Sequence, residues 1–227
     1  MGIPQVLEQL LRGRKFEFPM ERAIFMTVLH RLMVSGSDRA AERWCRRYAI
    51  GGLKKLELHH LYRAMGWLGE PLPQIEQPQD QRLGPRLRKD VIEEQLFARR
   101  RDLFSGLELV FFDTTSIYFE GEGGESLGQY GYSKDHRPDR KQIVVGVVLD
   151  DQGRPICCEL LPGNTADVTT LIPVIDRLKE RFEIKKVCIV ADRGMISEQT
   201  ITKLGQRHVA YILGARLRRV KEIREQV

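Results

Sequence analysis

The spacing of apolar residues divides the chain into a helical first half and a second half that opens with strands. From Met20, apolar residues recur at helical spacing as far as a stop at Ser35-Gly36. The same spacing predicts three further helices, over residues 38–50, 56–68 and 83–104. The polar segment 69–80, which contains prolines, is typical of a loop or linker. We therefore expect an all-helical region over residues 1–105 and a separate domain over residues 106–227.

In the second half, runs of β-branched and aromatic residues predict strands over residues 107–119, 143–150, 156–161, 186–191 and 211–215. Residues 167–182 are predicted to form a helix with Thr165 or Asp167 as its N-cap, and Ser197 is predicted to cap a shorter helix. The first three strands have no helix between them, and the turn at residues 151–153 joins the last two of these as an antiparallel hairpin. The order β-β-β-α-β-α-β disagrees with a doubly wound parallel sheet. It matches the mixed α/β sheet of the ribonuclease H-like fold.

Two strands of this pattern each carry one aspartate. Asp113 lies in the run VFFDTTSIYF, and Asp192 follows the run VCIVA. A lone aspartate at such a place usually caps a turn. In the ribonuclease H-like order, however, the first and fourth strands are parallel neighbours, so both acids leave the sheet at the same end. We therefore expect the two carboxylates to converge.

Two converging carboxylates repel each other unless a cation lies between them or one is protonated. The acids have no thiols or histidine cluster beside them in the sequence, and oxygen ligands alone select Mg²⁺ or Mn²⁺. Paired ions of this kind activate an attacking oxygen and stabilise a leaving oxygen in phosphodiester cleavage. We prefer this interpretation to one in which each aspartate caps a separate turn.

The composition is that of a globular protein, with 42% hydrophobic and 30% charged residues in 227. No stretch approaches the roughly 20 apolar residues that a membrane helix needs, and the N-terminal residues do not resemble a signal peptide. The four cysteines show no zinc-binding pattern, which indicates reduced structural thiols in a cytoplasmic protein.

The positive charge of the chain is confined to its first half. Residues 1–106 hold 19 Lys and Arg against 13 Asp and Glu, whereas residues 107–227 hold 18 of each. This excess points to a polyanionic partner, although a basic solvated surface without a partner stays open. The spacing around Gly36 allows a helix-turn-helix in which Arg43, Arg46 and Arg47 contact DNA phosphates, but charged helix faces are more often only solvated.

The second half resembles the DDE transposases of bacterial insertion sequences, in the IS-four-like superfamily. The matching motifs are DTTSIYFEG from Asp113, GYSKDHRPDRKQIVVGVVLD from Gly131, PGNTAD from Pro162 and VADRGMIS from Val190. Together they cover about residues 107–216. The resemblance implies DNA transposition: Mg²⁺-dependent cleavage of DNA at the ends of a mobile element and strand transfer into target DNA. It names terminal-repeat and target DNA as partners and allows a homodimer on DNA.

The resemblance also implies roles for particular residues. Asp113 and Asp192 match the first two acids of the catalytic triad and would hold the metal. Contacts to DNA phosphates are expected from Lys134, His136, Arg137, Arg140, Lys141 and Arg193. Asn164 and Asp167 match a turn-and-cap motif, for which we expect structural support, with direct catalysis as the alternative.

The chain departs from the family pattern at the third acid. Relatives carry a glutamate in a Tyr-Arg-Glu-Lys pattern on a helix well beyond the fifth strand. Glu222 and Glu225 lie near that position, but they come early and without the tyrosine. We therefore expect an internal piece of a transposase with an incomplete catalytic site.

Two other functions remain open on the sequence alone. The chain can be a non-catalytic DNA-binding remnant of a transposase that uses its basic helices and the loop around His136. It can also be a Mg²⁺ phosphatase with Asp113 as nucleophile. That class needs a second aspartate two residues on, where this chain has Thr115, and three strands without helices disfavour its fold.

Overall fold

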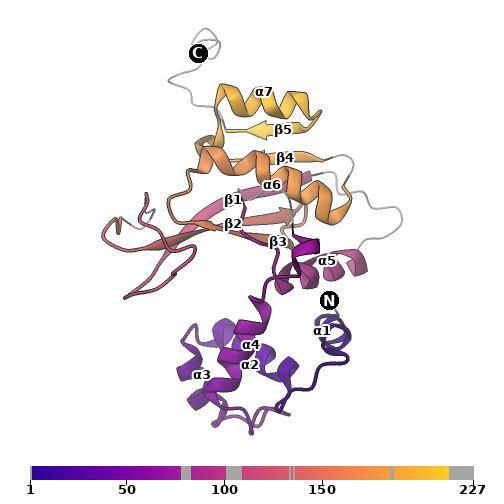
Figure 1. Cartoon of the computed structure of the whole chain (residues 1–227), viewed down its shortest axis with the longest axis vertical. Helices are drawn as coiled ribbons and strands as arrows, with labels where there is room; N and C mark the ends of the chain where they lie inside the picture. The colour runs from indigo at the N-terminus through magenta and orange to yellow at the C-terminus, as the bar shows by residue number, and fades with distance from the viewer. Residues whose placement is uncertain are drawn as a thin grey trace. The chain divides into compact units, whose positions relative to one another are not determined.

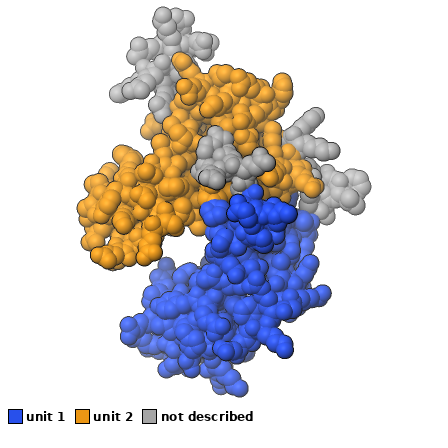
Figure 2. Space-filling model, viewed as in Figure 1, with its two compact units in different colours: residues 1–77, 85–100 blue, residues 78–84, 101–227 orange. Residues whose placement is uncertain are grey.

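The computed structural model describes residues 2–77, 83–100, 109–132, 134, 136–184 and 187–214. The chain forms two compact units, shown in different colours in Figure 2. Residues 1–77 and 85–100 make up unit 1, and residues 78–84 and 101–227 make up unit 2. None of the described helices is long and apolar enough to cross a membrane.

Unit 1 is helical, as the apolar spacing predicts. Its helices are α1 (Ile3–Leu11), α2 (Met20–Met33), α3 (Asp38–Cys45), α4 (Leu58–Leu68), the 3₁₀ turn η1 (Gln74–Glu76) and α5 (Arg88–Arg100). Their apolar sides enclose one core, in which Met26, Leu53 and Leu61 are fully buried.

Helix boundaries in unit 1 differ from the sequence prediction at three places. Helix α1 was not predicted, although Val6, Leu7, Leu10 and Leu11 follow helical spacing. Helix α3 ends at Cys45, before the predicted residue 50. Helix α5 begins at Arg88 instead of residue 83, because the Asp90 carboxylate accepts the Leu87 N–H at 2.8 Å and so caps the helix there.

Unit 2 contains one five-stranded sheet (Figure 1). Its strands are β1 (Leu109–Tyr118), β2 (Gln142–Asp150), β3 (Pro155–Pro162), β4 (Cys188–Ala191) and β5 (Ala210–Leu213). They lie in the order β3-β2-β1-β4-β5. The first three are antiparallel, and β4 is parallel to both β1 and β5. The order β-β-β-α-β-α-β and the parallel β1–β4 pair are thus confirmed, and the sheet has the ribonuclease H-like arrangement.

Two helices and a short turn complete unit 2. Helix α6 (Asp167–Phe182) follows β3, η2 (Arg193–Met195) follows β4, and α7 (Glu198–Gln206) precedes β5. Ser197 caps α7 as predicted, because its hydroxyl accepts the Thr200 N–H at 3.0 Å. At α6 the N-cap prediction is wrong: Ala166 holds that position and no side chain caps the helix.

The two faces of the sheet differ in their burial. One face carries Val110, Phe112, Val148 and Ile189, all of which are buried. On the other face, the strand register places Leu149, Phe111, Val190 and Ile212 opposite one another across four strands. Phe111 is 38% exposed and Ile212 58% exposed. This second face therefore presents an apolar row, Leu149–Phe111–Val190–Ile212, that the described residues leave open to solvent.

All four cysteines lie in described segments, and no disulfide joins any two of them. Cys45 and Cys157 are buried, whereas Cys158 and Cys188 are partly exposed. Cys157 and Cys158 thus differ in burial, as adjacent residues on opposite faces of a strand do.

Candidate active site

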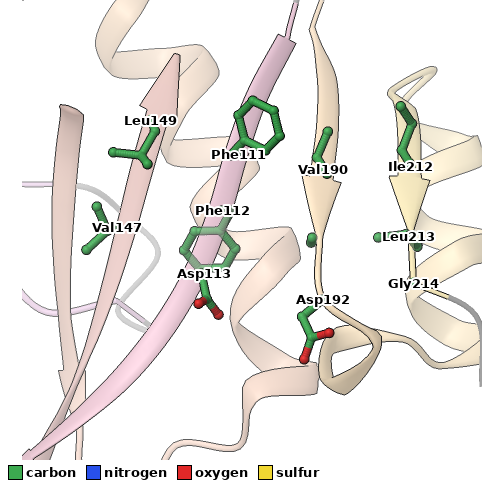
Figure 3. Close-up of a pocket in the computed structure, with 11 residues that line it drawn as sticks. Phe111, Phe112, Asp113, Val147, Leu149, Val190, Asp192, Ile212, Leu213 and Gly214 are labelled. Carbon is green, nitrogen blue, oxygen red and sulfur yellow. The ribbon is translucent and has the colours of Figure 1, made fainter. Parts of the chain in front are cut away.

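The two aspartates lie where the parallel β1–β4 pairing stops. The register pairs Phe111 with Val190 and Phe112 with Ala191, and it ends there. Asp113 and Asp192 are the next residues on the two strands. Both are exposed, and both line a cavity of about 490 Å³ whose other walls include the apolar row. Figure 3 shows both carboxylates leaving the ends of this paired region toward the same side of the cavity. The two acids thus leave their strands at the same end and line one cavity, as the strand order predicts.

The position of Asp113 differs from the expectation in one respect. It does not end its strand: β1 continues to Tyr118, paired with β2 alone. The side chain is exposed because it lies on the open face, just beyond the point where β4 ends. The desolvation cost of burying an unpaired carboxylate in a strand therefore does not arise here.

The donor set at this site consists of oxygens. Two carboxylates with neither thiols nor imidazoles beside them in the cavity lining suit a hard divalent cation such as Mg²⁺ or Mn²⁺. Among the described residues, no group of three His, Cys, Asp or Glu side chains is placed to hold a metal ion. Asp113 and Asp192 can thus supply two protein ligands, and further ligands must be water, substrate oxygens or residues outside the described ranges. The candidate third acids Glu222 and Glu225 lie outside those ranges.

A lysine, a threonine and an aspartate from three separate segments meet beside Asp113. The Lys134 ammonium donates to the Thr114 carbonyl oxygen and, at 3.0 Å, to the Thr114 hydroxyl. The Thr114 hydroxyl donates to Asp167 Oδ1 at 2.7 Å, and Lys134 Nζ lies 3.4 Å from Asp167 Oδ2. Asp167 is the first residue of α6, one position after the N-cap Ala166, and its carboxylate is engaged by Thr114 and Lys134.

No sequence motif connects Lys134 with Asp167. Each belongs to a different motif along the chain, and the motifs predict a DNA-phosphate contact for Lys134 and a helix cap for Asp167. A buried threonine directly after Asp113 is the link between them, since its hydroxyl can accept from one and donate to the other. Alternate side chains of β1 are buried, and Thr114 is one of them. A buried hydroxyl needs polar partners, so this alternation is the sequence feature that could have indicated the contacts.

The remaining predicted DNA contacts lie on the β1–β2 connection or beside Asp192. Arg137 donates twice to the Asp139 carboxylate at 2.9 Å, and its guanidinium lies 5.3 Å from the centre of the Tyr118 ring. Hydrogen bonding from Arg137 lowers the pKa of Asp139 to about 2. Arg140 Nε is 3.4 Å from the same carboxylate.

Three further residues of that prediction are placed as follows. His136 is exposed, and its positive φ of 56° changes the direction of the backbone at that residue. Lys141 directly precedes β2 and is partly exposed. Arg193 begins η2 directly after Asp192 and is exposed. The structure thus brings Arg193 and Lys134 beside the acids, and the other four lie on the connection between β1 and β2.

The tight approach at Gly163 fixes the base of this connection. A methyl group at Gly163 would lie 1.9 Å from the Gln142 carbonyl oxygen, and one at Gly131 would lie 2.1 Å from the Gly163 carbonyl oxygen. The Gln142 side-chain amide also donates to the Tyr132 and Gly163 carbonyl oxygens. The connection is therefore held against the end of β3 by backbone contacts that only glycine allows.

Comparison with known structures gives similarities at low sequence identity. The Mos1 transposase paired-end complex with left transposon end is 12% identical, with 92% of this chain and 72% of that chain covered and a TM-score of 0.33. The Drosophila P element transposase strand transfer complex is 14% identical, with 92% of this chain and 47% of that chain covered and a TM-score of 0.46. The piggyBac transposase synaptic complex with hairpin DNA is 13% identical, with 98% of this chain and 48% of that chain covered and a TM-score of 0.47. This chain spans about half the length of the last two proteins.

At these TM-scores the structural similarities carry no argument about function, and no curated protein matches the chain significantly. The assignment rests on the domain family described as Transposase DDE domain, which matches residues 104–226. That match covers more than half of the chain and includes the whole sheet and both aspartates. The chain belongs to the Transposase DDE domain family.

Proposed function

We propose that unit 2 is a catalytic domain that cuts DNA strands and joins them to target DNA, with Asp113 and Asp192 as two ligands of Mg²⁺ or Mn²⁺. The observation that carries this proposal is the shared position of the two acids, directly beyond the last paired residues of β1 and β4. A bound pair of such ions would activate the attacking oxygen and stabilise the leaving oxygen of a phosphodiester. The two carboxylates would hold the ions, and the rigid parallel ladder would fix the separation of the carboxylates.

We further propose that the site is incomplete within the described residues and needs a third carboxylate. The support is the open apolar row, which reaches from Leu149 to Ile212 along the same cavity as the acids. Exposed apolar rows of this kind are usually covered by another segment or partner. A segment that covers the row and carries an acid would complete the ligand set.

We assign the DNA contacts to the basic side chains of the β1–β2 connection and to Arg193. Arg137, Arg140 and Lys141 form a cationic group, the connection cations, on a segment that is anchored beside β3 and also carries His136. Phosphate contacts by such side chains position DNA without reading its sequence. The substrates would be mobile-element ends and target DNA. We also propose that the chain belongs to the IS-four-like superfamily of these transposases.

A metal-dependent nicking assay tests the proposal. Purified chain is incubated with a supercoiled plasmid and with Mg²⁺ or Mn²⁺, and relaxed circles are counted over time. Asp113→Asn and Asp192→Asn should each lower the nicking rate by at least about 10³-fold, because each removes a metal ligand. Asp151→Asn, on the exposed β2–β3 turn, serves as the matched control and should keep the full rate. Equal nicking by the wild type and both site variants would exclude the proposal.

The second candidate function is DNA binding without catalysis. It is favoured by the lack of any three-residue metal group among the described side chains. In that case the wild type would shift labelled DNA in a gel while showing no metal-dependent nicking, and Asp113→Asn would bind DNA as the wild type does.

A further inference from the structure

The strand β1 has an open backbone edge next to the acids. Up to Phe112 it has β4 as a neighbour, but from Asp113 onward it pairs only with β2. At Thr114 the backbone groups on this open edge have hydrogen-bond partners outside the sheet ladder. The Thr114 N–H donates to Asp113 Oδ1 at 2.7 Å, and the Thr114 carbonyl accepts from the Lys134 ammonium. The backbone of one residue thus links the Asp113 carboxylate to the Lys134 side chain.

Lys134 reaches this edge from a backbone that is itself held in place. Its own N–H donates to Ser116 Oγ at 3.1 Å, and Ser116 is buried in β1. Its ammonium has two acceptors on Thr114 and a carboxylate partner in Asp167. A lysine ammonium has three donors, so these partners occupy the directions in which it would otherwise bind a DNA phosphate.

Asp167 is a third carboxylate close to the candidate metal site. A methyl group built on Gly194 would lie 3.7 Å from Asp167 Oδ2 and equally 3.7 Å from Asp192 Oδ2. The two carboxylates therefore flank the same glycine, two residues after the second acid. Asp167 differs from Asp192 in its partners, because it accepts from the Thr114 hydroxyl and faces the Lys134 ammonium.

We propose that Lys134 is a positioning residue that keeps Asp167 out of the metal-ligand set while holding the Thr114 edge beside Asp113. This inference rests on the proposed function, since it presumes that Asp113 and Asp192 bind the metal. The ammonium neutralises Asp167 and fixes it against β1. Without this ammonium, Asp167 keeps the Thr114 hydroxyl as a donor but loses its cationic partner, and a divalent cation at Asp192 would attract it.

The test is Mn²⁺ binding, followed by the paramagnetic resonance signal of the free ion as the protein is titrated. Lys134→Gln should bind Mn²⁺ about tenfold more tightly than the wild type, because a cation is lost and a carboxylate is released near the site. Lys134→Arg keeps the charge beside Asp167 and should keep the wild-type affinity. In the double variant Lys134→Gln/Asp167→Asn this gain in Mn²⁺ affinity should disappear. A purely structural lysine would not produce this pattern.

Controls separate the possible failures. Lys203→Gln removes a surface cation of α7 and should leave Mn²⁺ affinity unchanged. Unchanged or weaker Mn²⁺ binding in Lys134→Gln, with a melting temperature near that of the wild type, overturns the inference. A weaker affinity for a DNA duplex with unchanged Mn²⁺ affinity assigns Lys134 to DNA instead. If Lys134→Gln does not fold, Lys134→Arg decides: a Mn²⁺ affinity that differs from that of the wild type in this charge-conserving variant overturns the inference.

The proposed function fails by a different result. If Asp113→Asn and Asp192→Asn bind Mn²⁺ as tightly as the wild type, the two acids are not the metal site, whatever the Lys134 variants do. Failure of the proposed function and failure of the Lys134 inference are thus distinguished by different variants in the same Mn²⁺ titration.

Discussion

At the scale of single residues, Asp150 organises the turn between β2 and β3. Its carboxylate accepts the Gln152 and Arg154 N–H groups at 3.0 and 2.8 Å and the Arg154 guanidinium at 2.7 Å. Burial alone would raise the pKa of Asp150, but the hydrogen bonds from Arg154 and Gln152 outweigh it and lower the pKa below its usual value. A carboxylate with a lowered folded-state pKa stabilises the protein above its unfolded-state pKa. That stability is lost as the pH falls through the folded-state value.

Asp150→Asn should lower the free energy of unfolding at pH 7 by about 1–2 kcal/mol, because charge-assisted hydrogen bonds in the turn are weakened. Since the variant has no carboxylate to protonate, its difference from the wild type should shrink as the pH falls below about 4. Urea unfolding between pH 3 and 7 measures both effects. The exposed neighbour Asp151→Asn should stay within about 0.5 kcal/mol of the wild type. A pH-independent difference for Asp150→Asn would contradict the prediction.

At the scale of elements, a buried ion cluster ties α6 to β3. Glu159 on β3 accepts from Arg177 at 2.7 Å and from Arg181 at 2.9 Å, and Arg177 also donates to the Gly84 carbonyl at 2.7 Å. The side chains of all three charged residues are at most 6% exposed. Arg177 and Arg181 are four residues apart, so one face of α6 presents both to the same strand residue. The cluster therefore fixes the position of the helix whose first residue is Asp167.

Glu159→Gln should destabilise unit 2 by about 3–5 kcal/mol, because it removes the buried negative charge that Arg177 and Arg181 share. The matched control is Asp176→Asn, which breaks the Asp176–Arg207 pair at 2.8 and 2.9 Å. That pair is 39% and 30% exposed, so its loss should cost less than about 1 kcal/mol. Chemical unfolding with fluorescence detection compares the two. Similar costs for both variants would show that burial of the cluster does not matter.

At the scale of the whole molecule, the charge distribution bears on the proposed contacts with DNA. The excess of Lys and Arg belongs to residues 1–106, where Arg43, Arg46 and Arg47 are exposed at and after the end of α3. The connection cations belong to unit 2, whose overall charge is near balance. A local cationic group on a neutral domain binds phosphates at one place without strong attraction elsewhere.

Arg140→Gln/Lys141→Gln should reduce the salt dependence of DNA binding. Each phosphate contact contributes about 0.9 to the slope of log affinity against log salt, so the slope should fall by about two. Fluorescence anisotropy with a labelled duplex at several salt concentrations measures it. Lys179→Gln/Lys203→Gln removes equal charge from α6 and α7 and should leave the slope nearly unchanged. An equal slope change in both double variants would show that only net charge matters.

The element order follows closely from the sequence, and the boundaries follow less well. Strand periodicity, the tight turn after Asp150 and the Ser197 cap all act over a few residues, so they can be recognised without a tertiary structure. The start of α5 at Arg88 and the early end of α3 depend on particular side-chain and packing contacts. The N-cap of α6 was misassigned because Asp167, a good capping residue, has its carboxylate engaged by Thr114 and Lys134 instead.

Sequence patterns alone predict the helical first half, the order of strands and helices in the second half, and the two aspartates at one end of the sheet. These depend on periodicity and on the local chemistry of single residues. Only the tertiary structure decided that β4 ends at Ala191 while β1 continues, which leaves Asp113 exposed and the Thr114 backbone in need of partners. It also decided that Lys134 meets Asp167, because such contacts depend on how separate segments pack and not on the residues next to them in the chain.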